Sequence, residues 1–273
     1  AINGYFDTVT KEEALELKLR FFEELTHEYH LVEEVTGEKG ISDSIQDKGR
    51  YGFQEIGIPP AGYMDYLSAQ LANYILGNPL HNPVFELHFP TSSFKFDSTY
   101  TICITGANFV PILNEKSVEL NQTIQVLKND TLQFLQPVEG KIAYLAIKGS
   151  MKGNEWLNSN SYLSKRIEKN DTFFFEYDTT SDTTIPDNSL IQKRVEEVRK
   201  LIFNHTPIRF IPGPAWNHLT EKSLTDLINN PFNTTIQSNR MGYAIKGPLL
   251  HLIENKSYLS SAVTKGTMQL LPN

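Results

Sequence analysis

Residues 45–65 constrain the fold of this chain more than any other stretch of its sequence. These 21 residues contain four glycines and two adjacent prolines. Glycine permits a positive φ and a close approach of other groups, whereas proline fixes φ at about −65°. A regular helix or strand does not accommodate this mixture, so the sequence predicts a shaped loop. We expect this loop to hold the polar side chains of Gln46, Asp47 and Arg50 in fixed positions.

The composition limits the class of protein. A chain of 273 residues can form one large domain or two modest ones, and 40% hydrophobic with 21% charged residues is typical of a globular protein. The net charge of −7 argues against binding to nucleic acid or to an anionic membrane. Cys103 is the single cysteine, which excludes an internal disulfide and a cysteine-rich zinc site.

The same sequence indicates the compartment. It contains no run of 18 apolar residues, and its N-terminus lacks the order of regions that defines a signal peptide. A lone cysteine fits a reducing environment. We therefore expect a cytoplasmic protein that does not cross a membrane.

Two helices are expected near the N-terminus. Thr10 and Glu13 form a capping box ahead of an amphipathic helix over residues 11–29. This helix is either a surface addition to the domain or a docking helix for a partner. A second helix follows the glycine–proline loop (residues 45–65), because Met64, Leu67, Leu71 and Ile75 form one apolar stripe. Gly77 is placed as the C′ residue that ends it.

Short strands follow, which favour a barrel or a sandwich over a parallel α/β sheet. We expect them at residues 84–87, 94–96, 100–104, 112–113, 123–127, 131–135 and 141–147, with Gly106 closing the third.

The polar stretch 178–189 predicts a linker, and a helix over 191–203 follows it. A second strand-rich unit would begin at 208–211, with a helix near 223–228 and strands near 242–246 and 268–271. The predicted domains are an N-terminal extension (1–40), a first β domain (41–180), a linker with its helix (181–205) and a second β domain (206–273).

The loop contains the main candidates for chemistry. Arg50 presents a planar fork that suits a carboxylate or a phosphate, and Asp47 lies three residues before it. These two side chains could instead pair with each other or cap the turn. Asp65 could cap the second helix, and the start of that helix could also bind an anion. The loop glycines would let backbone N–H groups approach an oxyanion.

Other candidates lie further along the chain. Residues 105–108 could form a glycine turn that exposes N–H groups to a ligand, or a plain turn. Cys103 lies among alternating apolar residues, as expected of an inert core thiol. His81 and His88 flank Glu86 without a recognised metal spacing. Arg240 could form a loop salt bridge or contact an anion. The sequence contains no P-loop and none of the common dinucleotide, zinc-protease or serine-hydrolase motifs.

Several short motifs follow one another in a set order. They are Gln46-Asp47-Lys48-Gly49-Arg50, Gly62-Tyr63-Met64-Asp65, Leu71-Ala72-Asn73, Phe85-Glu86, Thr105-Gly106-Ala107-Asn108, Pro212-Gly213-Pro214, the segment 238–247 and the segment 265–269. Together they resemble the signature of the KipA-like family, which includes the C-type subunit of 5-oxoprolinase and the allophanate hydrolase subunit 2 type domain. This family is related to the carboxyltransferase unit of urea carboxylase. The resemblance covers residues 40–273.

The resemblance implies a mainly β fold of two cyclophilin-like β-barrel domains with short helices. It implies a component of an ATP-dependent 5-oxoprolinase that works with the KipI-like B-type subunit of that enzyme, together with its A-type subunit. ATP with magnesium is the implied cofactor, and no metal site is expected within this chain. The implied catalytic residues are Asp47, Glu86 and Arg50, and the implied substrate-binding residues are Gln46, Gly62, Asp65, Thr105, Gly106, Asn108 and Arg240.

Two other functions are compatible with the resemblance. One is carboxyl transfer from carboxybiotin to a urea-like amide, with biotin as the cofactor. The other is non-catalytic regulation, in which the protein binds a KipI-like kinase inhibitor. The chain departs from the family pattern at Lys48, Tyr63, Asn108 and Asn239, and two of these positions lose a carboxylate. Relatives continue beyond the point matched by residue 273, so we expect the second domain to be incomplete at its C-terminus.

Overall fold

The computed structural model describes residues 40–153, 155–162, 165–176, 193–194, 197, 210–235, 237–238, 240, 242–254, 263–264 and 266–270, together with the backbone of residues 30–34. The chain divides into two units, residues 1–204 and residues 205–273, and each is described by itself. The predicted helix over 11–29, the linker 178–189 and most of the predicted helix over 191–203 lie outside the described residues.

The first unit is built mainly from short β-strands. In chain order its elements are β1 (His30–Glu34), β2 (Ser44–Gln46), the 3₁₀ helix η2 (Gln54–Ile56), α2 (Tyr66–Leu76), β3 (Val84–Leu87), β4 (Phe94–Phe96), β5 (Tyr100–Asn108), β6 (Pro111–Leu113), β7 (Lys116–Ser117), β8 (Thr123–Val126), β9 (Thr131–Phe134), β10 (Glu139–Ile147), β11 (Ser150–Lys152) and β12 (Thr172–Glu176).

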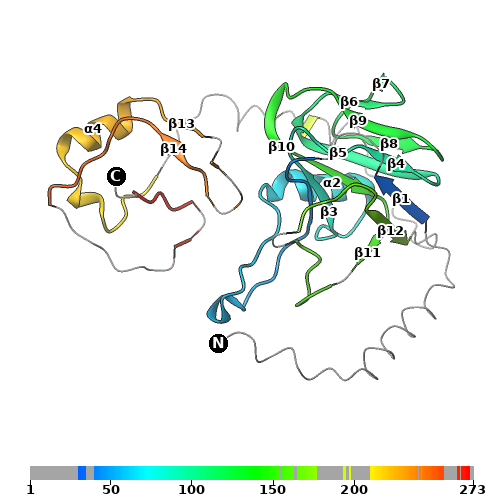
Figure 1. Cartoon of the computed structure of the whole chain (residues 1–273), viewed down its shortest axis with the longest axis horizontal. Helices are drawn as coiled ribbons and strands as arrows, with labels where there is room; N and C mark the ends of the chain where they lie inside the picture. The colour runs from blue at the N-terminus through cyan, green and yellow to red at the C-terminus, as the bar shows by residue number, and fades with distance from the viewer. Residues whose placement is uncertain are drawn as a thin grey trace. The chain divides into compact units, whose positions relative to one another are not determined.

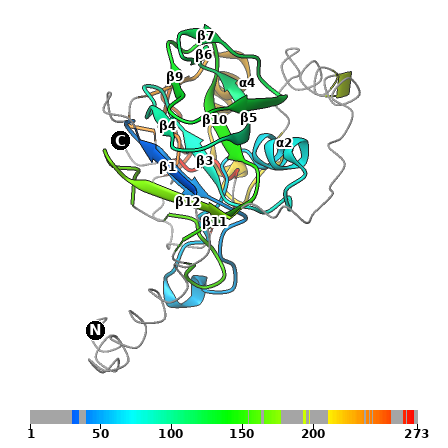
Figure 2. The same cartoon turned by 90° about the vertical axis from the view of Figure 1, so that its right-hand side faces the viewer.

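These strands form two antiparallel sheets. The seven-stranded sheet has the order β11-β12-β1-β4-β9-β6-β7, and the five-stranded sheet has the order β2-β3-β10-β5-β8. Figure 2 shows β11, β12, β1 and β4 next to one another, as this order requires. Both sheets end in free edges among the described strands, so the structure there is an open sandwich. The predicted mainly β class is confirmed, although the described sheets do not close into a barrel.

The first unit has three layers. Apolar side chains from both sheets pack between them, among them Phe85 of β3, Ile102 of β5 and Phe94 of β4, all fully buried. A second core, which includes Cys103, lies between the five-stranded sheet and α2. The helix packs on β5 and β10, as Figures 1 and 2 both show. Side chains that alternate along the five-stranded sheet therefore face either the sheet core or the helix.

Helix α2 begins and ends where the sequence predicts. Asp65 is its N-cap and accepts a hydrogen bond from the Ser68 N–H at 3.1 Å, and Gly77 ends it with φ of 70°. The predicted buried stripe is wrong in part, because Leu67 is 63% exposed. The small side chains of Ala69 and Ala72 are fully buried instead, which lets the helix lie close to the sheet.

Strand β5 is longer than expected. The sequence predicts that Gly106 closes it, but the strand continues to Asn108 and pairs with β10 from Ile102 to Gly106 and again at Asn108, with an irregular register between Glu139 and Ala143. Gly106 lies within the strand at φ of 80°, and a Cβ there would come within 2.6 Å of the Ile142 carbonyl oxygen. Residues 105–108 are therefore an irregular strand segment and not a turn.

The second unit contains few regular elements among its described residues. They are the 3₁₀ helix η3 (Trp216–His218), α4 (Glu221–Asn229), β13 (Asn233–Thr234) and β14 (Ile245–Lys246). Helix α4 matches the prediction, and β14 covers part of the strand expected near 242–246. Phe210 and Ile211, and also residues 268–270, are not in strands, so those two predictions are wrong where the structure describes them. None of the described helices is long and apolar enough to span a membrane.

Candidate functional site

The two arms of the glycine–proline loop run side by side, with η2 at the tip (Figure 1). The Arg50 N–H donates to the Pro60 carbonyl at 2.8 Å, and the Tyr63 N–H donates to the Asp47 carbonyl at 3.0 Å. Gly49 has φ of +83°, and a Cβ there would lie 2.7 Å from the Pro60 oxygen. The arms approach each other this closely only because glycine occupies such positions.

Asp47 fastens the first arm to a distant segment, residues 159–161. One carboxylate oxygen accepts hydrogen bonds from the Gly49 N–H at 2.7 Å and from the hydroxyls of Ser159 at 2.7 Å and Ser161 at 2.6 Å. The other accepts from the Asn160 N–H at 2.6 Å. Asp47 is 4% exposed, and both of its carboxylate oxygens act only as acceptors in these bonds. It caps the loop, as one of the alternatives from the sequence supposed.

Arg50 is also buried, and its guanidinium contacts backbone carbonyls. Nη2 donates to the Ser161 oxygen at 2.5 Å and Nε donates to the Trp156 oxygen at 3.3 Å, while the group lies 5.0 Å from the centre of the Trp156 ring. Nη1 has no hydrogen-bond partner within the part of the chain that the structure describes. Burial lowers the pKa of Arg50, and the neighbouring Asp47 carboxylate opposes that change.

The Gln46 side chain links the two arms of the loop by a hydrogen bond. Its side-chain oxygen accepts from the Gly62 N–H at 3.1 Å, and its amide nitrogen donates to the Ser44 hydroxyl at 2.9 Å. The Gly49 N–H is bound by Asp47, and the Gly52 N–H donates to the Gln54 side chain at 3.1 Å. The N–H groups of these glycines therefore donate to side chains of the loop itself.

Glu86 lies under the second arm of the loop, on the face of the five-stranded sheet that is covered by α2. It is fully buried, and its Oε2 accepts from the Met64 N–H at 2.9 Å and from the Tyr144 hydroxyl at 2.9 Å. The Asp65 N–H donates to the same tyrosine oxygen at 2.7 Å. The carboxylate and the phenol together bind the start of α2 to the sheet.

Strand register explains why these groups meet. Tyr144 of β10 pairs with Glu86 of β3 on one side and with Thr105 of β5 on the other. The Thr105 hydroxyl donates to the Ser68 carbonyl in α2 at 2.7 Å. Two of the predicted site residues thus lie in one row across three strands. Tyr144, between them, was missed, because residues 142–147 are all apolar and their sequence does not show which side chain takes which face.

A histidine and a second buried carboxylate extend this cluster. His88 Nε2 lies 3.5 Å from Glu86 Oε1, and burial lowers the pKa of His88 while Asp43 opposes that change. Asp43 accepts hydrogen bonds from the backbone N–H groups of His88 at 2.7 Å and Ser92 at 2.6 Å. Burial raises the pKa of Asp43 in spite of these bonds. Sequence reasoning did not assign Asp43 to the site.

The remaining predicted site residues do not contact the Glu86 carboxylate in the hydrogen bonds described here. Asp65 is held at the N-cap of α2, and the Asn108 side chain accepts from the Val110 N–H at 2.9 Å. Arg240 lies in the second unit, where burial lowers its pKa and Tyr243 opposes that change. The described residues include no group of three or more histidine, cysteine, aspartate or glutamate side chains that could hold a metal ion. Cys103 is buried, and burial raises the pKa of its thiol, so it stays protonated.

The fold and the site define a class of mainly β domain in which a glycine–proline loop is fastened to buried carboxylates. Comparison with known proteins identifies the family more narrowly. The model of the family described as the carboxyltransferase domain, subdomain A and B, matches residues 56–273, and the chain belongs to this family. The predicted family resemblance is confirmed. The matched region begins inside the loop, after Arg50.

The chain is similar to two groups of named proteins, C-type subunits of 5-oxoprolinase and urea amidolyases. The chain is 24% identical over 242 residues to the C-type subunit of 5-oxoprolinase from Escherichia coli (strain K12), which covers 86% of this chain and 75% of that protein. It is 34% identical over 157 residues to urea amidolyase of Lachancea kluyveri, covering 54% of this chain but only 9% of that protein. The crystal structure of the K. lactis urea amidolyase superposes with a TM-score of 0.66 at 22% identity, over 89% of this chain and 16% of that one. This last likeness shows the fold.

Proposed function

We propose that this chain is the C-type subunit of an ATP-dependent 5-oxoprolinase-like amidohydrolase that acts with two further proteins, a KipI-like B-type subunit plus a ring-opening A-type subunit. The observation that carries the proposal is the similarity to the C-type subunit of 5-oxoprolinase, because it extends over 86% of this chain and 75% of the relative. The reaction breaks the ring C–N bond of 5-oxoproline and adds water, which yields glutamate.

Glu86 is the acid or base that we assign to this reaction. It is fully buried and accepts a hydrogen bond from the Tyr144 hydroxyl at 2.9 Å, so Tyr144 is the neighbouring group through which its proton can move. His88 Nε2 lies 3.5 Å from the other oxygen, without a hydrogen bond to it. Asp47 is better suited to positioning, since its two oxygens already accept four hydrogen bonds. The proposal therefore gives Asp47 the role of holding Arg50.

Arg50 is the anion contact that we assign to the substrate carboxylate or to a phosphate. Nη1 is a buried donor with no partner among the described residues, and an arginine fork suits either anion. Arg240, which lies in the second unit, is assigned an anion contact of its own under the same proposal.

The nucleotide fits this loop poorly. The N–H groups of Gly49, Gly52 and Gly62 donate to side chains of the loop itself, so they do not form a cradle for phosphates. We therefore assign ATP and its magnesium ion to the partner protein, and no step of the proposal uses a nucleotide bound at the glycine–proline loop.

Reconstitution tests the proposal. Purified chain is mixed with A- and B-type subunits, and the ATP-dependent release of glutamate from 5-oxoproline is measured with and without this chain. Activity should require all three proteins. Glu86→Gln should lower kcat by about 100-fold or more, as expected when a general acid or base is lost. Glu55→Gln, which changes an exposed carboxylate at the loop tip, should leave kcat unchanged. Full glutamate release without this chain would refute the proposal.

A second candidate is a carboxyltransferase component of a biotin-dependent enzyme that acts on a urea-like amide. The family description and the 34% identity to a urea amidolyase segment favour it. Its test is the transfer of carboxylate from carboxybiotin to urea, followed as the loss of carboxybiotin that depends on both urea and this chain. Transfer without any glutamate release in the reconstituted assay would favour this candidate over the first.

A further inference from the structure

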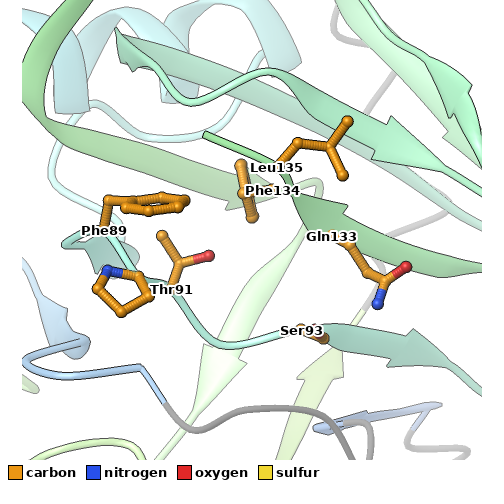
Figure 3. A pocket seen from close by; sticks show the side chains of 7 residues that line it. Phe89, Thr91, Ser93, Gln133, Phe134 and Leu135 are labelled. Carbon is orange, nitrogen blue, oxygen red and sulfur yellow. The ribbon is translucent and has the colours of Figure 1, made fainter. Parts of the chain in front are cut away.

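A pocket of about 280 Å³ lies in the first unit, where β4 and β9 separate. Neither the predicted site residues nor the Glu86 cluster lines it. In Figure 3, Phe89 and Thr91 lie on one side of Phe134, and Gln133 and Ser93 lie on the other. The labelled lining residues are Phe89, Thr91, Ser93, Gln133, Phe134 and Leu135.

The pocket exists because a strand ladder stops early. Strands β4 and β9 pair only at Phe94 with Leu132 and at Lys95 with Thr131. The same register would bring Ser93 opposite Gln133 and then Ser92 opposite Phe134, but the Ser92 N–H donates to the Asp43 carboxylate at 2.6 Å instead. The edge of β9 at Phe134 therefore has no β4 partner, and the space beside it is open.

Polar groups with unused hydrogen-bonding capacity face this space. The Ser93 hydroxyl and the Gln133 carboxamide make no hydrogen bond to any described residue. Thr91 differs, because its hydroxyl donates to the Ser92 carbonyl at 3.1 Å. A serine hydroxyl and a carboxamide each donate and accept, so together they match a ligand group that does both.

The rest of the lining is apolar and uncharged. Phe89 is held against Phe109 with ring centroids 5.7 Å apart, while Phe134 and Leu135 supply further apolar surface. No lining residue is an aspartate, glutamate, lysine, arginine or histidine. The lining offers no counter-charge to an ionised ligand, so the pocket favours neutral ligands over charged ones. Its volume of about 280 Å³ lies just below the range of about 300–1,000 Å³ that is usual for ligand pockets, so only a small molecule fits.

We propose that this pocket binds a small neutral molecule that carries an amide group on an apolar body. The amide bonds to Ser93 and Gln133, and the apolar body packs between Phe89 and Leu135. Substrates of the proposed reaction that carry a carboxylate should bind here more weakly than neutral amides, because no lining residue is charged. The site is thus a second binding site of this chain, with a ligand class of its own.

Benzamide and benzoate are suitable probes, since they have the same shape and differ in charge and in hydrogen-bond donors. The full chain, labelled with ¹⁵N, is titrated with each compound, and amide shifts are followed by NMR. Benzamide should produce saturable shifts at Ser93 and Phe134, and benzoate should bind at least about tenfold more weakly. Equal affinity for the two probes, or no saturable shift at these amides, would overturn the proposal.

Two glutamine variants separate a specific contact from a general effect. Gln133→Ala removes the exposed carboxamide at the pocket and should raise the Kd for benzamide about three- to tenfold, which is the loss of one hydrogen bond. Gln125→Ala changes an exposed glutamine on β8 and should leave the Kd unchanged. An equal effect of the two substitutions, or none at Gln133, would contradict the assigned contact.

Discussion

Both carboxylate oxygens of Asp47 accept a backbone N–H, one from Gly49 and one from Asn160. This arrangement requires an acceptor at both positions, because an amide nitrogen in place of either oxygen would direct a donor at another donor. Three residues of one distant segment take part, so a single carboxylate defines the position of the loop relative to the sandwich. Asp47 acts on Arg50 by holding the arm from which that residue extends.

Asp47→Asn tests this role at the level of stability. In either orientation, the new amide NH₂ faces a backbone N–H, of Gly49 or of Asn160, so one buried donor loses its acceptor. We expect the free energy of unfolding to fall by about 2–4 kcal/mol, measured by urea denaturation. Glu55→Gln, on the exposed tip of the same loop, should change it by less than about 0.5 kcal/mol. Equal effects of the two substitutions would contradict the role given to Asp47.

The pKa of His88 leads to a pH-dependent stability. Its folded-state pKa is lowered by burial, so below the ordinary histidine pKa of about 6.5 the unfolded chain binds more protons than the folded one. Stability should therefore fall as the pH is lowered from 7 towards about 5.5, by no more than about 1.4 kcal/mol per pH unit from this group. Asp43 has a raised pKa and makes a contribution of the opposite sign, in which stability falls as pH rises above its unfolded value.

Histidine variants isolate this contribution, because Asp43 and Glu86 remain in each of them. Urea denaturation at several pH values should give a shallower pH slope for His88→Gln than for the unsubstituted chain. His81→Gln removes an exposed histidine and should leave the slope unchanged. A slope that persists in His88→Gln would assign the effect to another group.

Sequence reasoning reached the loop residues of the site but not their partners. Gln46, Asp47 and Arg50 stand together in a segment whose glycines and prolines already predict a fixed shape. Ser159 and Ser161 lie more than 100 residues away from Asp47 and Arg50, in a stretch with no periodic pattern. The partner of a buried polar group is set by tertiary packing, and a single sequence carries no signal for it.

Among the elements, the loop shows most clearly how sequence specifies geometry. Gly49 and Gly52 both have a positive φ, of +83° and +90°, but only Gly49 has backbone atoms of the other arm where a Cβ would be. Gly49 is required both because its φ is positive and because a Cβ would contact the other arm, whereas Gly52 is required by its positive φ alone. The two positions therefore form a matched pair.

Alanine substitutions at these positions should differ in cost. Gly52→Ala introduces a left-handed alanine with nothing within 4 Å of its Cβ, which should cost about 1–2 kcal/mol. Gly49→Ala adds a contact of 2.7 Å to the Pro60 oxygen, so the arms must separate, and we expect a loss of about 3 kcal/mol or more. Unfolding free energies from urea denaturation compare the two. Equal losses would mean that the arms can separate freely.

Helix α2 shows where pattern reasoning at the scale of an element succeeds and where it fails. Its ends were predictable, because Asp65 and Gly77 carry the capping chemistry in their own side chains and conformations. Its buried face was not predictable in the same way. The predicted apolar stripe consists of large apolar residues, and one of them, Leu67, lies on the exposed side of the helix. A helix that packs close to a sheet buries alanines, and hydrophobicity alone ranks those below leucine.

At the scale of the whole chain, the two units differ in how much they bury. The first has one core between its sheets and another beneath α2. Among the described residues of the second unit, Ser223 is the one buried residue, and large apolar side chains such as Ile211, Leu249 and Ile253 are each more than 60% exposed. Local stability follows buried apolar contact, so the units should open at different free energies.

Helices α2 and α4 provide the comparison that tests this difference. Both begin at a side-chain N-cap, Asp65 in α2 and Thr220 in α4, so the capping contribution is similar. Helix α2 buries five residues against the sheet, whereas α4 buries Ser223 alone. In native-state hydrogen exchange read by mass spectrometry, the amides of α4 should exchange at least about 100-fold faster than those of α2. Equal protection of the two helices would show that the second unit is stabilised by contacts that its described residues do not make among themselves.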